Sequence, residues 1–523
     1  MIIHMRAFVI LVANLLLFCG SVTAQLTEQQ QIQKLNYVYS YIRNNYVEDV
    51  SLEPLVEEAI RATLKELDPH SNYLTKEEMK QARNRLRGKQ VGIGIKYFVH
   101  NDTVVIRSVM DNSPALRADI RPNDRIIAVD NRNIVSLNID SIATILKGDQ
   151  NSKVRLQVLR RNSPDIIDIK LIRDDIATST ISSAYRVGDV GYISVSSFSK
   201  RVDKDLYAAY EELGDIGSLI IDLRDNGGGA LNGAINLTSL FLEKGDIIVS
   251  TEGKTNNTTY HKQNEGVTIT LPVVVLINEN SASASEIFAG AIQDHDRGVV
   301  VGHTSFGKGL IQRMIDLKDG SGFTLTIAHY KTPSGRIIQR PYDRGEREAY
   351  YTNRDRFMHP DSIAHDGVPT FKTLKYGRTI YGGGGITPDV YISNDGVRIS
   401  QIVAKSVTNA AFEHAVIDFW DMVSPEAILE EYPTVDNFSN GYNIDDRLKD
   451  IYYRTAGCDK DELSEIDQEF INTMLLATMA EQLYASSARH YIYGLRFDQT
   501  LRRAIEIASD IATYSAILEG GVK

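Results

Sequence analysis

The chain has 523 residues, of which 43% are hydrophobic and 24% are charged, and its formal net charge is -11. At about 100–200 residues per domain, this length predicts about two to four domains. The acidic balance argues against nucleic acid as a partner, because binding to phosphates requires clustered Lys and Arg side chains. With 2 cysteines and no HExxH pattern, no metal is indicated.

Residues 1–24 have the three-part pattern of a secretory signal peptide. Arg6 precedes an apolar run that ends at Cys19, and a small-residue cleavage site, Val22–Ala24, follows. The run is short for a membrane span, so we expect the segment to be cleaved and the protein to be periplasmic. The alternatives are an uncleaved anchor in the inner membrane, which would be the chain's only membrane contact, and a lipoprotein attached through Cys19. The bulky Phe18 disfavours the lipoprotein.

Residues 25–87 are expected to form an N-terminal helical segment. Leu35, Val38 and Ile42 recur at the spacing that places apolar side chains on one face of a helix. A second helical pattern of the same kind includes Leu55. Both patterns predict helices rather than strands.

A polar turn, Leu67–Thr75, interrupts the helical segment. Thr75 is followed three residues later by Glu78, and this spacing predicts a capping box at the start of the next helix. His70 and Ser71 lie within the turn. We interpret them as ordinary loop polarity.

Between residues 88 and 173 the pattern changes to short alternating strands, including Thr103–Ser108 and Asp124–Asp130, with a short helix at Ile139–Leu146. The segment Ser113–Asp124 matches the "SPA…AGI..GD" pattern of PDZ domains, so residues 88–173 resemble a PDZ domain. Asp119 and Asn123 stand where that pattern has glycine. The resemblance implies a peptide-binding loop made of Val91, Gly92, Ile93, Gly94 and Ile95.

The physical case for a peptide groove at this loop is independent of the resemblance. Successive backbone N–H groups of a glycine-containing loop can receive a C-terminal carboxylate, and the adjoining strand edge can add an extended peptide. The alternative is that Gly92 and Gly94 only form a tight turn. The Val and Ile side chains of the loop favour apolar tail residues.

Residues 180–395 alternate strands with helices. Gly191–Val195, Ser218–Arg224 and Val273–Ile277 are predicted strands, and helical patterns follow each of them. This alternation predicts an α/β layered core. Residues 340–380 interrupt it as a polar loop, interpreted as an insertion at the rim of the core.

The run Ser281–Glu286 lies between a predicted strand and a predicted helix. Ser283 with Glu286 three residues later is by itself an ordinary capping box. A nucleophile at a helix start is also favourable, because the free N–H groups there stabilise developing negative charge. Lys308 lies between two glycines beside an apolar stretch, and its desolvation would lower its pKa toward that of a general base. Gln312 is placed to orient the amine.

The glycines Gly227–Gly229 follow a predicted buried strand and precede a helix. Glycine at such a turn lets a backbone N–H approach a substrate carbonyl. The alternatives are a plain strand-to-helix turn and a phosphate loop, but the spacing fits neither GxGxxG nor GxxxxGK[ST], so no nucleotide is expected.

Together these segments resemble the carboxyl-terminal processing proteases, also called tail-specific proteases, of peptidase family S41. The resemblance rests on the order and spacing of five segments: Gly191–Val195, Asp222–Gly229, Ser281–Glu286, Thr304–Gly309 and Thr332–Arg336. It implies a multidomain α+β protein with a ClpP/crotonase-like α/β core at 180–395. Family members use no cofactor.

By the same resemblance, Ser283 is the nucleophile, Lys308 the general base and Gln312 the residue that orients the lysine. The backbone N–H groups of Gly228 and Ala284 are the implied oxyanion donors. The implied function is that of a serine endopeptidase with a Ser/Lys dyad that cleaves envelope proteins. Its substrates would be proteins or peptides with free C-termini, selected through the PDZ domain.

Two other interpretations of the chain's function remain open. One is a catalytically silent PDZ-bearing periplasmic scaffold or adaptor, which the presence of Ser283, Lys308 and Gln312 disfavours. The other is an acyl-handling enzyme that uses only the glycine-rich oxyanion loop and would not need Lys308. Residues 396–523 show helical spacing throughout, and this C-terminal region is a candidate surface for an adaptor or for self-association.

Overall fold

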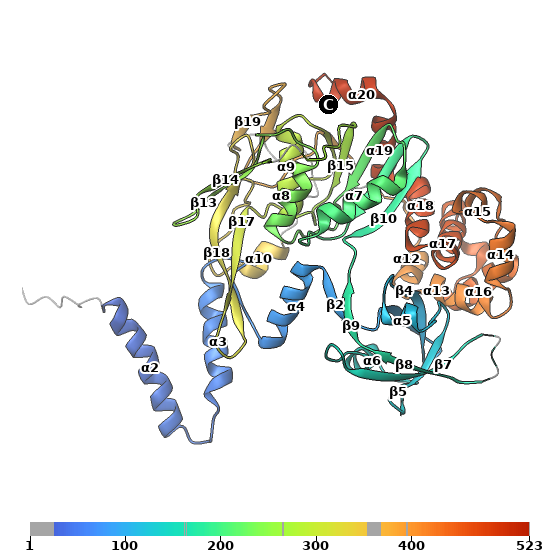
Figure 1. The fold of residues 1–523 in the computed structure, drawn as a ribbon, viewed down its shortest axis with the longest axis horizontal. Coiled ribbons are helices and arrows are strands. Elements are labelled where there is room, and N and C mark those ends of the chain that lie inside the picture. The colour runs from blue at the N-terminus through green and yellow to red at the C-terminus, as the bar shows by residue number, and fades with distance from the viewer. Residues whose placement is uncertain are drawn as a thin grey trace, which may run out of the picture. The chain divides into compact units, whose positions relative to one another are not determined.

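The computed structural model describes residues 26–161, 163, 165–263, 266–352, 368–393 and 396–521 (Figure 1). The predicted signal peptide, residues 1–24, lies outside the described residues, as does much of the predicted 340–380 insertion. The chain divides into two compact units between Leu67 and Asp68. Within the described ranges, no helix is long and apolar enough to cross a membrane.

The first unit contains two helices, α2 (Glu28–Asn45) and α3 (Leu52–Lys65). Thr27 begins α2, because its hydroxyl accepts the N–H of Gln30 at 3.3 Å and the Gln30 side chain accepts the N–H of Thr27 at 2.8 Å. The Ser51 hydroxyl caps α3 by accepting the N–H of Glu53. The predicted N-terminal helical segment is confirmed.

The second unit starts with the turn that contains His70, followed by β1 (Asn72–Leu74) and α4 (Lys76–Arg87). The Thr75 hydroxyl accepts the Glu78 N–H, and the Glu78 carboxylate accepts the Thr75 N–H at 2.8 Å. The capping box predicted from this spacing is therefore present. The strand β1 pairs with β18 (Gly322–Lys331), which attaches the turn to a distant part of the chain.

The PDZ-like region is a six-stranded sheet around its own apolar core, with a separate two-stranded ribbon. The sheet has the order β3-β4-β5-β7-β8, and β6 pairs with β5. Its elements are β3 (Ile95–His100), β4 (Thr103–Val109), α5 (Pro114–Arg117), β5 (Arg125–Val129), β6 (Arg132–Asn133), α6 (Ile139–Leu146), β7 (Lys153–Leu159) and β8 (Ile167–Ile172). The ribbon joins β2 (Lys89–Gly92) to β9 (Asp174–Ala177). Because β3 is the edge strand, its outer side has no strand partner among the described residues and could accept an added strand.

Backbone conformation explains the PDZ-like sequence pattern. Gly94 has φ +85, and a Cβ there would lie 2.1 Å from the Cβ of Ser113, so only glycine fits. Asp119 and Asn123, which replace glycines of the family pattern, have φ 55 and 69. They therefore adopt the left-handed backbone that the glycines would supply, which Asn and Asp tolerate better than most residues.

The region predicted as an α/β layered core is built on a second six-stranded sheet with the order β10-β11-β12-β15-β16-β21. The strands are β10 (Ile181–Val187), β11 (Val190–Val195), β12 (Ser218–Asp222), β15 (Val273–Ile277), β16 (Val299–Gly302) and β21 (Val390–Tyr391). Pairing is parallel from β11 to β21, and β10 joins antiparallel. The predicted α/β layered core is confirmed.

Helices cover both faces of this sheet, so alternate residues of β12 face opposite cores. Leu219 and Ile221 pack with α7 (Val202–Leu213), α8 (Leu231–Ser239) and α9 (Ala284–Asp294). Ile220 packs on the other side, against the C-terminal helices α19 (Gln499–Ser509) and α20 (Ile511–Leu518). The last part of the helical C-terminal region is thus a layer of this α/β core.

A second, smaller sheet is built from segments that are distant in the sequence. This five-stranded sheet joins β1 and β18 to β13 (Ile247–Glu252), β14 (Thr258–His261) and β17 (Leu310–Asp316). The remaining described elements before the C-terminal region are α10 (Arg347–Thr352) and the pair β19 (Thr370–Lys372) and β20 (Thr379–Tyr381).

The rest of the C-terminal region is helical, as predicted. It consists of α12 (Gln401–Thr408), α13 (Ala411–Trp420), α14 (Pro425–Glu431), α15 (Val435–Gly441), α16 (Asp446–Ala456), the 3-10 turn Lys460–Glu462, α17 (Glu465–Leu483) and α18 (Ser486–Phe497). Its apolar core includes Val105 from the PDZ-like sheet, and Phe98 packs against it.

Polar contacts reinforce this docking of the PDZ-like sheet on the helices. The Arg107 guanidinium lies between the carboxylates of Glu413 and Glu481. His100, which is 3% exposed, contacts His414 through their Nδ1 atoms at 2.6 Å and Asp418 at 2.8 Å. The PDZ-like region is therefore held by one face of its sheet.

Reversing the charge of Arg107 tests whether this contact holds the PDZ-like region in place. In Arg107→Glu, three carboxylates would meet in a half-buried site, and we expect the free energy of unfolding to fall by about 1–3 kcal/mol. Hydrogen exchange in β4 and α17 should accelerate. Arg155→Glu is the control, because Arg155 pairs with Asp168 inside the PDZ-like sheet. Equal exchange in both variants would contradict docking through Arg107.

Candidate active site

Ser283 lies at the turn between β15 and α9, as the N-cap residue of the helix. Its backbone has φ 58 and ψ −111, a conformation that costs free energy for a residue with a side chain. The strand and helix on either side are buried and hold the turn in this shape. The residue faces a cavity of about 1050 Å³ that also contains Ala284, Lys308, Gln312 and Gly227–Gly229. The predicted catalytic and oxyanion residues therefore come together.

Glu286, one helical turn after Ser283, is almost fully buried. Its carboxylate accepts the N–H of Ser283 at 2.8 Å, which is half of the predicted capping box. The same two oxygens accept the Ser305 hydroxyl at 2.6 Å, the Gly307 N–H at 2.7 Å and the Lys308 N–H at 2.9 Å. A single side chain thus connects the turn of the serine with the loop of the lysine.

The protonation state of Glu286 follows from two opposing causes. Burial raises its pKa, while the hydrogen bonds from Ser305, Gly307, Lys308 and Ser283 lower it. Each of these partners is an N–H or O–H donor, so both oxygens of the Glu286 carboxylate act as acceptors.

The backbone of Lys308 is fixed by close approaches on both sides. A Cβ at Gly307, where φ is +86, would lie 3.1 Å from the Gly385 nitrogen, and a Cβ at Gly309 would lie 2.8 Å from the Gln339 nitrogen. The two glycines are therefore required for packing. Burial lowers the pKa of the Lys308 side chain, and the carboxylates of Glu286 and Asp68 only partly oppose this. A neutral amine is the form that a general base needs.

Gln312 lies on β17 and lines the same cavity. Its Nε2 donates to the Thr326 hydroxyl at 3.2 Å on the neighbouring strand β18. This bond orients the amide and leaves Oε1 as the acceptor. Gln312 is thus held as an acceptor within the cavity that it shares with Lys308.

The turn before β1 contacts Thr326, the strand partner of Gln312, a role that the sequence did not reveal. The Asp68 carboxylate accepts the N–H groups of His70 and Ser71, each at 2.8 Å, and the Ser71 hydroxyl at 2.6 Å. The Ser71 hydroxyl in turn accepts the Thr326 N–H at 3.1 Å. Ser71 is fully buried. The interpretation of this turn as ordinary loop polarity is wrong.

His70 is held between two tyrosines of α10. Its Nδ1 lies 2.9 Å from the Tyr351 hydroxyl and its Nε2 lies 3.2 Å from the Tyr350 hydroxyl. Burial and the nearby Lys308 lower the pKa of His70 to about 3. His70 is therefore neutral and adds no positive charge beside the lysine. The sequence signal for this role was only a histidine and a serine in a polar turn, which is too common to identify a site.

The glycine loop lies directly against the serine turn. A Cβ on Gly228 would be 2.6 Å from the Ala282 carbonyl oxygen and 2.8 Å from the Ala284 nitrogen, so no other residue fits. The Gly228 N–H donates to Asn226 Oδ1 at 2.9 Å. Among the described residues, Ala284 N–H has no hydrogen-bond partner. The two predicted oxyanion donors are neighbours, and one of them is engaged by Asn226.

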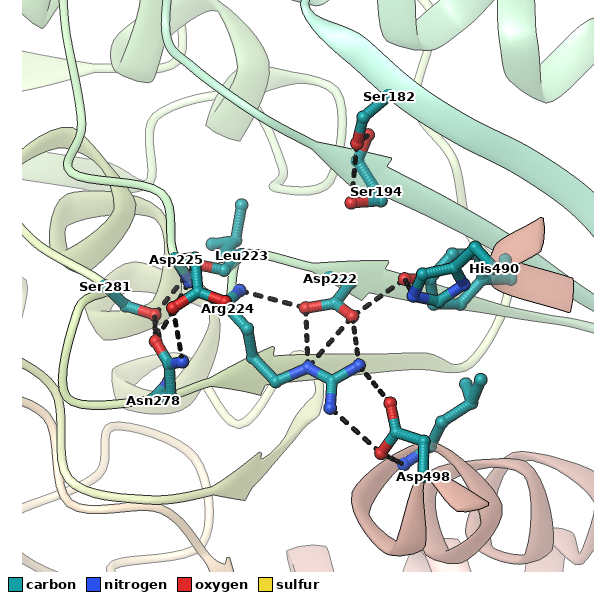
Figure 2. Close-up of polar contacts among 12 residues, drawn as sticks. Ser182, Ser194, Asp222, Leu223, Arg224, Asp225, Asn278, Ser281, His490 and Asp498 are labelled. Atoms are coloured by element: carbon teal, nitrogen blue, oxygen red, sulfur yellow. Dashed lines mark hydrogen bonds and ion pairs between the residues drawn. The ribbon is translucent and has the colours of Figure 1, made fainter. Parts of the chain in front are cut away.

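Hydrogen bonds from the serine turn brace the start of the glycine loop (Figure 2). Asp225 donates its N–H to Asn278 Oδ1 at 2.9 Å, and its carboxylate accepts the Asn278 amide at 3.0 Å. The Ser281 hydroxyl donates to the Leu223 carbonyl at 2.8 Å. The loop and the serine turn therefore form one rigid unit.

The cavity extends from the predicted catalytic residues to the PDZ-like ribbon. Its wall includes Lys89, Gln90 and Val91 of β2, together with Leu231, Ile287 and Tyr330 near Ser283. Apolar side chains thus surround the serine, and the first residue of the predicted peptide loop opens onto the same space. In the described part of the chain, no group of three or more His, Cys, Asp or Glu side chains is arranged to hold a metal ion.

Fold and site together define a peptidase with a PDZ domain, and comparison with known proteins gives its family. Residues 189–343 match peptidase family S41, residues 105–160 match a PDZ domain and residues 19–78 match the N-terminal domain of the activating protease CtpB.

Individual relatives agree. The chain is 34% identical over 349 residues to a carboxy-terminal-processing protease of Bartonella bacilliformis, which covers 65% of this chain and 80% of that protein. It is 32% identical over 317 residues to the carboxy-terminal processing protease CtpA of Bacillus subtilis. This match covers 60% of this chain and 68% of that protein. The solved photosystem II D1 C-terminal processing protease has a TM-score of 0.35 at 22% identity, over 72% of this chain and 96% of that chain. The identity and coverage of the Bartonella and Bacillus relatives show that the chain belongs to peptidase family S41, as a carboxy-terminal processing protease with a PDZ domain.

Replacing Glu286 by Gln tests its role in holding the two catalytic segments. The amide offers one acceptor oxygen, and its NH₂ group would face N–H donors, so we expect at least about a tenfold loss of activity and about 1–3 kcal/mol less stability. The control is Glu506→Gln, since the Glu506 side chain is 63% exposed. Wild-type activity in Glu286→Gln would show that the carboxylate does not position the site.

Proposed function

We propose that this protein is a serine endopeptidase in which Ser283 is the nucleophile, Lys308 the general base and Gln312 the residue that orients the lysine. The observation that carries the proposal is the position of Ser283 and Lys308 on one cavity, with their backbones joined through Glu286. The strained conformation of Ser283 at a helix N-terminus supports the assignment, because such strain gathers at reactive residues.

The reaction begins with a neutral Lys308. Its amine accepts the Ser283 proton as the serine oxygen attacks the scissile carbonyl, and the resulting ammonium then protonates the leaving amine. Water hydrolyses the acyl-enzyme, with the lysine again acting as base. Burial favours the neutral amine at the start, and the Glu286 and Asp68 carboxylates stabilise the ammonium that forms.

Negative charge develops on the carbonyl oxygen and requires donors beside Ser283. The Ala284 N–H has no competing acceptor among the described residues. The Gly228 N–H would exchange its bond to Asn226 for one to the oxyanion. The start of α9 adds its helix dipole in the same direction.

The PDZ domain supplies the selection of substrates. A tail could add to the open edge of β3 and place its terminal carboxylate against the loop Val91–Ile95. Because Val91 also lines the catalytic cavity, a chain bound there has a continuous path to Ser283. We therefore propose proteins or peptides with free, apolar C-termini as the substrates.

The location proposed for this activity is the periplasm. The proposal rests on the signal-like residues 1–24, and envelope proteins would then be the substrates. An uncleaved segment would leave the enzyme anchored to the inner membrane. Other proteins or a second copy of the chain are proposed to reach the enzyme through the exposed parts of the C-terminal helical region.

The test is cleavage of an unstructured protein with a free apolar C-terminus. We expect Ser283→Ala and Lys308→Ala to be folded and to lose at least about 1,000-fold of the wild-type activity. A wild-type enzyme that binds the tail without cleaving it would support a PDZ-bearing scaffold instead. Activity that survives in Lys308→Ala would indicate an acyl-handling site that depends on the oxyanion loop alone.

The pH profile gives the protonation state of the base. Since the neutral amine is the active form and its pKa is lowered, activity should rise with pH and level off below the value of about 10.4 for a free lysine. The same shift destabilises the fold fully below the pKa of Lys308 in the folded protein and fades toward pH 10.4. Lys308→Met should therefore be inactive and more stable than wild type at pH 7, by about 1 kcal/mol. A flat profile from about pH 6 to 10, with chemistry rate-limiting, would exclude Lys308 as the base.

A blocked C-terminus tests the role of the PDZ domain. Amidation removes the carboxylate that the loop would bind, so we expect kcat/KM for an amidated peptide to be at least about tenfold lower than for the free acid. The same peptide acetylated at its N-terminus is the control and should be cleaved normally. Equal cleavage of amidated and free peptides would exclude selection by the C-terminus.

A further inference from the structure

The two helices α18 and α19 bring charged side chains to the end of the central strand β12. They lie well beyond the segment 189–343 that matches peptidase family S41. Apolar residues of α19, Leu501, Ala504 and Ile507, are buried against the sheet. The position of α19 relative to β12 is therefore fixed by packing.

Asp498 stands between these two helices and points at Arg224, just after β12 (Figure 2). Its Oδ1 accepts Arg224 Nη1 at 2.9 Å, and its Oδ2 lies 2.7 Å from Arg224 Nη2. The same guanidinium donates Nε to both oxygens of Asp222, each at 3.0 Å. One arginine thus joins the end of the strand to the C-terminal helices through bidentate contacts.

A second contact from the C-terminal region reaches the other side of Asp222. The Tyr192 hydroxyl donates to Asp222 Oδ2 at 2.7 Å and must therefore accept from His490 Nε2, which is 3.2 Å away. His490 Nδ1 then accepts the Tyr185 hydroxyl at 2.9 Å. This pattern requires a neutral imidazole, and burial lowers the pKa of His490.

The network is nearly closed to solvent. The exposed fractions of the Asp222, Arg224 and Asp498 side chains are 4%, 18% and 13%. Burial alone would raise the pKa of Asp498, but the Arg224 guanidinium holds it below its usual range. The network holds two carboxylates and one guanidinium, so neutralising Asp498 leaves Arg224 paired with Asp222 but takes away the partner that ties the guanidinium to the C-terminal helices.

Arg224 lies where the strand becomes the glycine loop. The residues on each side of it, Leu223 and Asp225, are bound by the serine turn through Ser281 and Asn278. The backbone N–H of Arg224 also donates to Asp222 Oδ1 at 2.9 Å. Arg224 is therefore held to Asp222 through both its backbone and its guanidinium, between these two contacts. A shift of Arg224 would therefore move both the loop and the turn that carries Ser283.

We propose that Asp498 is a positioning residue of the protease, which acts through Arg224 on the glycine loop and the serine turn. The inference rests on the proposed role of Ser283. It assigns to the C-terminal helices a function in catalysis: they hold the loop that receives the oxyanion.

Asp498 also has a purely structural role that the test must separate. Its Oδ1 accepts the Leu501 N–H at 2.9 Å and so caps α19. Asparagine is as good an N-cap as aspartate and has nearly the same volume, so Asp498→Asn keeps the cap and removes the charge. Asp510→Asn is the matched control, because Asp510 caps α20 in the same way through Ala512 N–H. No ion pair of Asp510 is found among the described residues.

The experiment measures kcat and KM for both single variants and for a double-mutant cycle with Arg224→Gln. We expect Asp498→Asn to lower kcat at least about tenfold with KM changed less than about twofold, since substrate binding does not involve the network. Asp498→Glu should retain more activity, and the double variant should be no worse than Arg224→Gln alone. Asp510→Asn should stay within about twofold of wild type.

Four outcomes would overturn the inference. The first three are wild-type kcat in Asp498→Asn, additive losses in the cycle, and an equal loss in Asp510→Asn. The fourth is a loss of activity in Asp498→Asn that is fully accounted for by a loss of folded protein, as measured by the melting temperature.

A readout without catalysis separates this inference from the proposed function. In the full chain carrying Ser283→Ala, hydrogen exchange of residues 223–229 and 278–283 should be faster when Asp498→Asn is added and unchanged when Asp510→Asn is added. Faster exchange with an active Ser283→Ala enzyme would mean that the network holds the loop but that the nucleophile was assigned wrongly. Unchanged exchange would mean that Asp498 does not position the loop.

Discussion

The candidate active site depends on one buried carboxylate. The two carboxylate oxygens of Glu286 accept the N–H groups of Ser283, Gly307 and Lys308. These donors come from a helix start and from a loop that is distant in the sequence, so neither segment alone determines the separation of serine and lysine. Hydrogen bonds from several donors to one carboxylate are strong and directional inside a protein. The low dielectric strengthens each bond and makes the loss of any one of them costly. The glycines beside Lys308 follow from this constraint, since the loop must approach its neighbours closely to reach Glu286.

The same burial gives the site its chemical character. Desolvation raises the pKa of Glu286 and lowers the pKa values of Lys308 and His70. The lysine amine and the imidazole are therefore both favoured in their neutral forms, and their proximity adds to this because two neighbouring cations would repel each other. Asp68 and Glu286 provide the negative charge that stabilises an ammonium when it forms. Burial and charge placement thus oppose each other at Lys308, and this balance is what a base that must gain and lose a proton in each turnover requires.

The sequence predicts the parts of this site that local patterns encode. Ser283 at a strand-to-helix turn, Lys308 between glycines and Gly228 in its loop are recognisable because each needs a special backbone at a short range. The left-handed conformation of Asp119 and Asn123 is predictable for the same reason. Asp68, Ser71 and Asp498 are different: their partners are distant in the chain, and nothing in a polar turn or a helix cap shows which strand it will meet. The cover of the sheet by α19 is hidden likewise, because its apolar spacing gives a buried face and not the identity of its partner.

The C-terminal region therefore has two kinds of contact with the catalytic machinery. Its last helices form one layer of the protease sheet, so a chain that ended before them would expose the apolar side chains of Ile220 and Leu276. Its earlier helices hold a face of the PDZ-like sheet through Arg107 and His100. A segment outside the matched protease region thus touches both the PDZ domain and the strand that leads into the glycine loop. Because packed elements shift as units, a displacement of this helical region would reach both the PDZ domain and the glycine loop.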